Sequence, residues 1–293
     1  MAQRPRVALV TAAQAVGLDQ DEPLLIGALR ERGVAAEAVV WDDPAAEWSY
    51  WDLAVLRSSW DYPQRRNEFL AWAGRVDRDS RLRNPLSVIV WNSDKRYLLR
   101  LAAAGVPTVP SWFFGPADHV DLPRGDIVVK PAVSAGSQDT ARYGPRERDR
   151  AYAHADRLRA HGRDVLVQPY VAQVDERGET AMVYLADEFS HAIRKGPILR
   201  DTVETVGGLF AREDIATRTP SVVERTVAER ALDALPFDRA DLLYARIDLL
   251  HATDGQPLVL EVELVEPSLF LRYCDMAAVR FAQAIAAHLP RFP

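Results

Sequence analysis

Three carboxylates near the C-terminal end of the chain have the type and spacing of a metal site. Asp248 lies in the apolar stretch "ARIDLL", and Glu261 and Glu263 lie two residues apart in "VLEVELVEP". Side chains at i and i+2 of a β-strand share one face, and the turn sequence "ATDGQ" predicts a hairpin that brings Asp248 onto that face. Oxygen ligands alone favour Mg²⁺ bound jointly with phosphates. The alternative is a hairpin with one solvated face.

Arg246 precedes Asp248 by two residues and is predicted to point the same way. An arginine at this place either neutralises the carboxylates in a salt bridge or binds an anionic intermediate. The spacing alone leaves both interpretations open.

Lysine is rare in this chain. Of 36 basic residues only Lys95, Lys130 and Lys195 are lysines, which leaves 33 arginines. Where arginine supplies the general surface charge, lysine is expected where a compact ammonium is needed, although three could also remain by chance. Lys130 ends the β-branched stretch "IVVKP", and the small-residue loop "AVSAGS" that follows can bring backbone N–H groups close to phosphate oxygens. The chain has neither a Walker A motif nor a G-x-G-x-x-G motif.

The elements that must position these residues begin with an alternation of strands and helices. Apolar stretches at 6–12, 35–41 and 52–58 predict strands, and helical periodicity predicts helices at 22–33 and 67–78. Such alternation predicts a small parallel sheet. We expect this first domain to span residues 1–90.

The next two units have other patterns. Residues 91–171 are predicted to form an α+β unit, with a helix that is capped by Asn92 or Ser93 and runs to Ala104. Its other predicted elements are a strand at 127–131, a charged helix within 144–163 and a strand at 164–171. In the third unit, 172–293, the predicted elements are a strand pair turning at Asp187-Glu188, a helix started by Pro220, the carboxylate hairpin and a helix at 275–288.

Composition excludes several classes of protein. The formal net charge of −6 argues against a nucleic-acid-binding face, and no apolar run reaches the ~18–20 residues that span a bilayer. The start "MAQRPRVALV" enters a strand directly, so we expect no signal peptide. A single cysteine, Cys274, favours a reducing cytoplasm over a disulfide framework.

Six stretches in this order resemble the ATP-grasp superfamily of carboxylate–amine ligases. They are "DKRYLLRLAAAGVPTVP", "IVVKPAVSAGS", "VLVQPYV", "AIRKGP", "YARIDLL" and "LEVELVEPS". The resemblance implies an ATP-grasp fold like that of glutathione synthetase. Its parts would be an N-terminal parallel-sheet domain, a central α+β lid (91–171) and a mostly antiparallel C-terminal domain (172–293).

The resemblance also implies roles for individual residues. The nucleotide would meet Lys95 and Lys130 at its phosphates, Ser134, Gly136 and Ser137 in the lid loop, Gln168, Tyr170 and Val171 at the adenine, and Asp175 or Glu176 at the ribose. Asp248 and Glu261 would hold Mg²⁺. Glu263 stands where many relatives have asparagine, which places an extra negative charge in that site. Arg194, Lys195 and Arg246 would steady the transferred phosphoryl group.

The stretch "RSSWDY" after the third strand is a candidate substrate site, because residues past the ends of parallel strands face the ligand crevice. We expect Arg57 to pair with a substrate carboxylate, and Ser58, Ser59 and Asp61 to contact an amino group. Trp60 and Tyr62 are equally suited to a pocket wall and to ordinary packing. Glu266 and Ser268 follow the carboxylate strand and are also expected at the substrate.

The function implied by the resemblance is ATP-dependent C–N bond formation through a phosphorylated acyl intermediate, with ADP and phosphate as products. The cofactors would be ATP and two Mg²⁺ ions, with Mn²⁺ able to replace them. The partner would be a small amino-acid-type substrate, and a homo-oligomer is left open. "RSSWDY" with "ELVEPSLFL" resembles the ring-closing ligases of antibiotic pathways that convert O-ureido-D-serine to D-cycloserine. The alternatives are an intermolecular dipeptide or glutathione-type ligase and a non-catalytic ATP-binding sensor.

Overall fold

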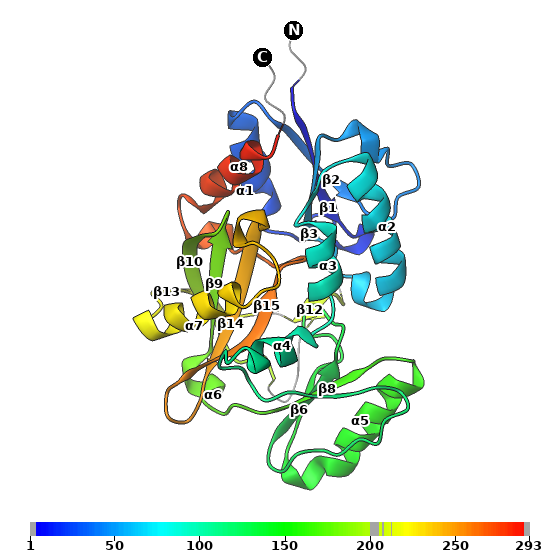
Figure 1. The fold of residues 1–293 in the computed structure, drawn as a ribbon, viewed down its shortest axis with the longest axis vertical. Helices are drawn as coiled ribbons and strands as arrows, with labels where there is room; N and C mark the ends of the chain where they lie inside the picture. The colour runs from blue at the N-terminus through cyan, green and yellow to red at the C-terminus, as the bar shows by residue number, and fades with distance from the viewer. Residues whose placement is uncertain (1–3, 200–204, 207, 212, 290–293) are drawn as a thin grey trace.

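The computed structural model describes residues 4–199, 205–206, 208–211 and 213–289. Three main sheets follow one another along the long axis of the molecule (Figure 1). A parallel sheet lies at one end, an antiparallel sheet lies in the middle, and a second antiparallel sheet with one long helix forms the other end. This is the mixed α/β and α+β architecture that the sequence predicted.

The N-terminal sheet has the strand order β2-β1-β3-β4 and is parallel throughout. Its strands are β1 (Arg6–Thr11), β2 (Ala35–Val40), β3 (Leu53–Ser58) and β4 (Leu82–Arg83). The helices α1 (Glu22–Glu31) and α2 (Arg66–Asp79) complete the alternation. β3 is buried along its whole length, as expected of a strand within a covered parallel sheet. β4 was not predicted, because two residues carry no periodicity.

The connection to the next sheet differs from the expected single helix. It contains two short helices, α3 (Leu86–Asn92) and α4 (Tyr97–Ala103). The prediction that Asn92 or Ser93 caps a helix was wrong, because Asn92 is the last residue of α3 and its side chain bonds to the edge strand of another sheet. Its Nδ2 donates to Val262 O (2.8 Å), and its Oδ1 accepts from Leu264 N (2.7 Å).

The sheet at the far end has the order β5-β8-β6-β7. Its strands are β5 (Trp112–Phe114), β6 (Ile127–Pro131), β7 (Ala141–Tyr143) and β8 (Val165–Pro169). The helix α5 (Arg148–Ala160) covers it (Figure 1), and Ala151, Ala155 and Leu158 share one buried cluster with Val129 and Val167.

The middle sheet has the order β13-β10-β9-β14-β15 and is antiparallel. Its strands are β9 (Glu179–Leu185), β10 (Glu188–Lys195), β13 (Ile215–Arg218), β14 (Tyr244–His251) and β15 (Pro257–Glu263). The remaining elements are α6 (Val174–Arg177), α7 (Val222–Asp233), α8 (Ala277–Ala287) and a strand pair, β11 (Thr205–Val206) with β12 (Phe210–Ala211). No helix in the described part of the chain combines the length and apolarity that a bilayer crossing requires.

Two predicted boundaries in this part of the chain, a strand turn and a helix start, were displaced by one residue. The β9–β10 turn uses Ala186 and Asp187, both at positive φ, rather than Asp187-Glu188. α7 starts from Ser221, whose hydroxyl accepts from Glu224 N while the Glu224 carboxylate accepts from Ser221 N. This capping box, rather than Pro220, defines the start of the helix.

Asn84 joins the N-terminal sheet to the middle sheet. It is fully buried, and its Nδ2 donates to Tyr244 O (3.0 Å) and Leu264 O (2.7 Å) while its Oδ1 accepts from Leu243 N (2.8 Å). One side chain thus satisfies three buried backbone groups that no strand neighbour reaches.

We predict that Asn84→Ala lowers the free energy of unfolding by about 3 kcal/mol or more, because three buried backbone groups lose their partner. Urea unfolding at pH 7 measures the loss, and Asn67→Ala on the exposed side of α2 serves as the control. Equal unfolding midpoints for the two variants would show that the bridge contributes little.

Candidate active site

Strands β14 and β15 place four charged side chains in two cross-strand pairs. Arg246 lies opposite Glu263, and Asp248 lies opposite Glu261. All four line one cavity between the middle sheet and the far sheet. The sequence predicted this shared face from the period of two and the turn between the strands.

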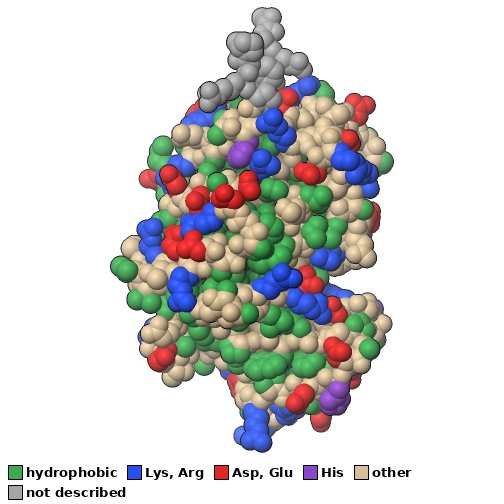
Figure 2. Space-filling model, viewed as in Figure 1, with side chains coloured by type: hydrophobic (Ala, Val, Ile, Leu, Met, Phe, Trp, Pro, Cys, Tyr) green, Lys and Arg blue, Asp and Glu red, His purple; other side chains and the backbone are tan. Residues whose placement is uncertain are grey.

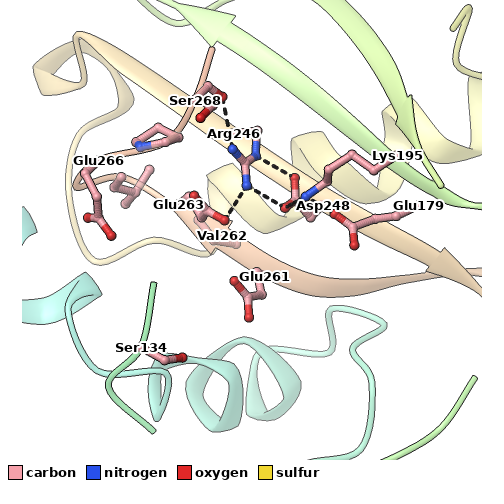
Figure 3. Close-up of polar contacts among 12 residues, drawn as sticks. Ser134, Glu179, Lys195, Arg246, Asp248, Glu261, Val262, Glu263, Glu266 and Ser268 are labelled. Carbon is pink, nitrogen blue, oxygen red and sulfur yellow. Dashed lines mark hydrogen bonds and ion pairs between the residues drawn. The ribbon is translucent and has the colours of Figure 1, made fainter. Parts of the chain in front are cut away.

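Both carboxylate oxygens of Asp248 are bound by cations. Arg246 Nε donates to Asp248 Oδ1 and Arg246 Nη2 to Asp248 Oδ2, both at 2.9 Å, and Lys195 Nζ lies 2.8 Å from Oδ2 (Figure 3). Burial works against the charged form of Asp248, but Arg246 and Lys195 outweigh it and hold the pKa of Asp248 below its usual range.

The other two lysines lie beside the Glu261 carboxylate. Lys130 Nζ donates to Glu261 Oε1 at 2.8 Å, and Lys95 Nζ lies 3.7 Å from the same oxygen. Burial disfavours the charged carboxylate, but the two ammonium groups prevail and lower the pKa of Glu261 to about 2. Lys130 comes from β6 of the far sheet and Glu261 from β15 of the middle sheet, so this ion pair crosses the cavity between them.

Glu263 carries the surplus negative charge of the cluster. Its carboxylate accepts from Arg246 Nη2 (Figure 3). Burial raises its pKa and the Asp248 and Glu261 carboxylates add to the rise, so that the pKa of Glu263 is about 7 despite the opposing Arg246.

Glu179 is a site residue that the sequence interpretation missed. It begins β9, pairs with Lys195 in the β9–β10 register and contacts the Lys195 ammonium. It also lines the cavity. The available signal was a charged residue at the start of an apolar strand, on the same hairpin as a rare lysine.

The loop after β6 closes one side of the cavity. Ser134, Gly136 and Ser137 line it, and Lys95 Nζ donates to Ser134 O at 2.7 Å. Gly136 has φ +59°, and a Cβ atom there would lie 2.2 Å from Leu209 O. The close approach of the loop to residues 209–210 therefore requires glycine at this position.

The predicted adenine segment lies at another wall of the cavity. Gln168, Tyr170 and Val171 line it, together with Val128, Val174, Leu250 and Leu260. Asp175 is not among the lining residues, and its carboxylate accepts from Tyr170 Oη at 2.6 Å and lies 3.6 Å from Arg142.

The predicted substrate residues at the end of β3 do not reach the cavity. Arg57 is 1% exposed; its Nη1 donates to Pro267 O (3.2 Å), and its Nη2 lies 3.6 Å from Asp19 Oδ2 and 3.7 Å from Asp21 Oδ2. The guanidinium is buried and does not line the cavity, so a substrate carboxylate in the cavity cannot reach it and the expected direct contact was wrong.

The neighbours of Arg57 are buried in the same way. Ser58 Oγ donates to Thr11 Oγ1, and Asp61 accepts from Trp41 Nε1 and Arg65 Nη2. Ser59 is also fully buried. Of the stretch "RSSWDY", only Trp60 and Tyr62 line the cavity. The structure therefore separates Ser58, Ser59 and Asp61 from any amino group in the cavity.

Arg194 also lies outside the cavity. Adjacent residues of a strand point to opposite faces, and Lys195 takes the inward face. Arg194 Nε donates instead to Arg177 O at 3.0 Å. The predicted grouping of Arg194 with Arg246 was therefore wrong.

The donor set fits magnesium shared with phosphates. Within the described residues no three His, Cys, Asp or Glu side chains form a ready metal cage. Mg²⁺ in nucleotide sites is held by one or two carboxylates plus phosphate oxygens, and Asp248 and Glu261 on adjacent strands supply such a pair.

Comparison with known proteins gives a consistent result. Residues 7–84 match the family model for the N-terminal domain of D-cycloserine synthetase DcsG. The cycloserine biosynthesis protein DcsG of Streptomyces lavendulae is 38% identical over 300 residues, which cover 97% of this chain and 98% of that protein. A crystal structure of D-cycloserine synthetase DcsG is similar with a TM-score of 0.87 at 37% identity, over 97% of this chain and 100% of that one.

More distant structures share the fold alone. D-alanine–D-alanine ligase from Bacillus anthracis has a TM-score of 0.67 at 14% identity, over 97% of this chain and 95% of that one. The ATP-grasp ligase PsnB has a TM-score of 0.63 at 16% identity, over 98% of this chain and 100% of that one.

We predict that Glu263→Gln changes how stability depends on pH. With its pKa raised to about 7 from an ordinary 4.5, Glu263 binds more protons in the folded chain than in the unfolded one. The stability that the protonated Glu263 contributes is fully present below pH ~4.5 and is lost as the pH rises through 7. The free energy of unfolding falls by up to about 3 kcal/mol over this range. Urea unfolding from pH 5 to 8 should show wild type losing stability relative to the glutamine variant.

The matched control is Glu31→Gln on the exposed surface of α1, which should run parallel to wild type across this range. If the stability of Glu263→Gln also changes with pH in parallel with that of wild type, the raised pKa of Glu263 is refuted.

Proposed function

The chain belongs to the family of the cycloserine biosynthesis protein DcsG, whose members are ATP-grasp ligases, and we propose that it closes the ring of D-cycloserine at the expense of ATP. ATP-dependent ligation that forms a C–N bond is the activity of the family. The substrate of this chain, O-ureido-D-serine, and the roles of its residues are our proposal.

One observation of the structure supports this proposal above the others. Three lysines and Arg246, drawn from both sheets and the segment between them, meet Asp248 and Glu261 in a single cavity. Each cation is paired with a carboxylate of opposite charge. A triphosphate with its metal ions can replace these pairings, because phosphate oxygens can bind the lysines while the metal ions bind the carboxylates.

The nucleotide would bind between the two sheets. The apolar wall at Val128, Val171 and Leu260 suits a base, and Lys130 and Lys95 would neutralise the phosphates. The loop that contains Gly136 lies beside Lys95, which donates to Ser134 O, and can present backbone N–H groups to phosphate oxygens.

Magnesium, when bound, neutralises the charge on the phosphate oxygens. We propose that Asp248, Glu261 and Glu263 hold two such ions and that Mn²⁺ can replace them, since all three ligands are carboxylates.

The chemistry has two steps. The substrate carboxylate attacks the γ-phosphorus of ATP, ADP leaves and an acyl phosphate forms. The substrate nitrogen bonded to the side-chain oxygen then attacks the acyl carbon; the ring C–N bond forms, the nitrogen gives up its proton, and phosphate leaves with one carboxylate oxygen. In O-ureido-D-serine this nitrogen also carries a carbamoyl group, which one water removes as carbon dioxide and ammonia.

The side chains contribute position and charge rather than covalent help, as is usual for phosphoryl transfer. Arg246 is held rigidly by Asp248 and by Ser268 O, which accepts from Nη1 at 3.0 Å. In our proposal Arg246 offsets the charge on the acyl phosphate and Lys195, which lines the same cavity, adds a second cation.

The test is turnover of O-ureido-D-serine with ATP and Mg²⁺. We expect ADP and D-cycloserine in equal amounts, with no added amine. ADP release that requires a separate amine would instead indicate an intermolecular ligase. No ADP release with any amino-acid substrate would indicate a nucleotide sensor.

We predict that Lys130→Ala and Glu261→Gln each lower kcat/KM at least ~100-fold, because each removes a charge that stabilises the transferred phosphoryl group or its metal. Coupled ADP release measures the loss. Arg30→Ala and Glu31→Gln, both on the exposed surface of α1, are the matched controls and should leave the rate unchanged. Near-wild-type turnover by either site variant would contradict the assignment.

A further inference from the structure

Residues 264–269, which follow β15, are held by buried side chains along their whole length; we call them the clamped segment. The hydrogen bonds to its first five carbonyls run from Asn84 to Leu264, Tyr244 to Val265, Trp60 to Glu266, Arg57 to Pro267 and Arg246 to Ser268. His191 Nε2 lies 2.9 Å from the sixth, Leu269 O, and Asp21 accepts from Leu269 N. A segment held at every carbonyl has little freedom to move.

The Glu266 side chain contrasts with this fixed backbone. It is 8% exposed and lines the cavity. Among the residues that the structure describes, no hydrogen-bond donor or cation pairs with its carboxylate. Figure 3 shows it pointing away from the Arg246 cluster, toward the side where Glu261 and Ser134 lie. Burial raises the pKa of the Glu266 carboxyl group well above its usual range, and a ligand of positive charge that pairs with this group would favour its ionised form.

Aromatic side chains line the same cavity as Glu266. Trp60 and Phe210 line the cavity with their ring centroids 5.0 Å apart, and Trp60 Nε1 donates to Glu266 O at 3.1 Å. Tyr62 is close enough that Glu266, after burial, raises the pKa of its hydroxyl. Aromatic faces attract cations, and this effect is greatest where water is excluded.

We propose that Glu266 binds the α-ammonium group of the acid substrate, with Trp60 and Tyr62 as its aromatic walls. The inference rests on the proposed ligase function and adds a selection rule, namely that the site takes acids with a free primary amine. The clamped segment carries Glu266 two residues before Ser268, whose carbonyl is bound by Arg246. The amine anchor and the cation for the activated carboxylate are therefore fixed relative to each other.

A rival role for Glu266 is that of a base that takes the proton from the attacking nitrogen. The two roles differ in what they change. An ammonium anchor affects the binding of amine-bearing compounds, whereas a base affects kcat for every compound that cyclises.

The experiment compares O-ureido-D-serine with 3-(carbamoylaminooxy)propanoate, the same acid without its amine. Calorimetry gives both dissociation constants for protein saturated with Mg²⁺ and ADP. In wild type we expect the deaminated compound to bind at least ~30-fold more weakly, as for loss of one partner of a buried charge pair. In Glu266→Gln the two compounds should bind within about threefold of each other, and Glu266→Asp should restore part of the preference.

The affinity of each variant for Mg²⁺ and ADP is the control for an intact site and should equal that of wild type. The subsite is overturned if Glu266→Gln keeps the wild-type preference for the amine, or if it lowers kcat without changing the binding of O-ureido-D-serine. Failure of the wild-type enzyme to turn over O-ureido-D-serine is a separate result, which overturns the proposed function and this subsite with it.

Discussion

The structure depends on the neutralisation of one buried and two half-buried carboxylates on two paired strands. Asp248, Glu261 and Glu263 lie on adjacent strands of one sheet, and burial alone would favour the neutral form of each. Cations come from elsewhere in the fold to meet them: Lys130 from the far sheet, Lys95 from the segment before α4, and Lys195 from the neighbouring hairpin. The arrangement of the two sheets around the cavity is therefore coupled to the charge balance within it. A triphosphate and its metal ions can enter such a site by exchanging partners rather than by displacing apolar contacts.

The N-terminal sheet contributes to this site through the clamped segment. Arg57, Trp60 and Asn84 all bind its backbone and belong to the part of the chain that matches the DcsG N-terminal family model. Substitutions in that sheet can therefore alter the cavity without any contact to a ligand. The side chains that hold the clamped segment come from the N-terminal domain and the middle sheet. Figure 2 shows the lobe of the far sheet set off from these two by a notch in the outline.

Much of this arrangement was predictable from sequence where a local rule decided it. The period of two and the "ATDGQ" turn predicted the shared face of Asp248 and Glu261, and the rarity of lysine drew attention to three residues that all line the cavity. The errors arose where long-range packing decided. Arg57 sits at a strand end like a ligand contact, but its acidic partners Asp19 and Asp21 come from the loop before α1 and its carbonyl partner from residue 267. Arg194 and Lys195 are adjacent cations of which only one can face inward, and no local rule chooses between them.

The central claim is that these side chains together bind a magnesium nucleotide, and calorimetry tests it most directly. Titration of the protein with a non-hydrolysable ATP analogue should give saturable heat with Mg²⁺ present and much weaker binding with a chelator, because phosphates and metal exchange partners with the lysines and carboxylates together. No saturable heat in the presence of Mg²⁺, or binding that ignores the metal, would contradict the account.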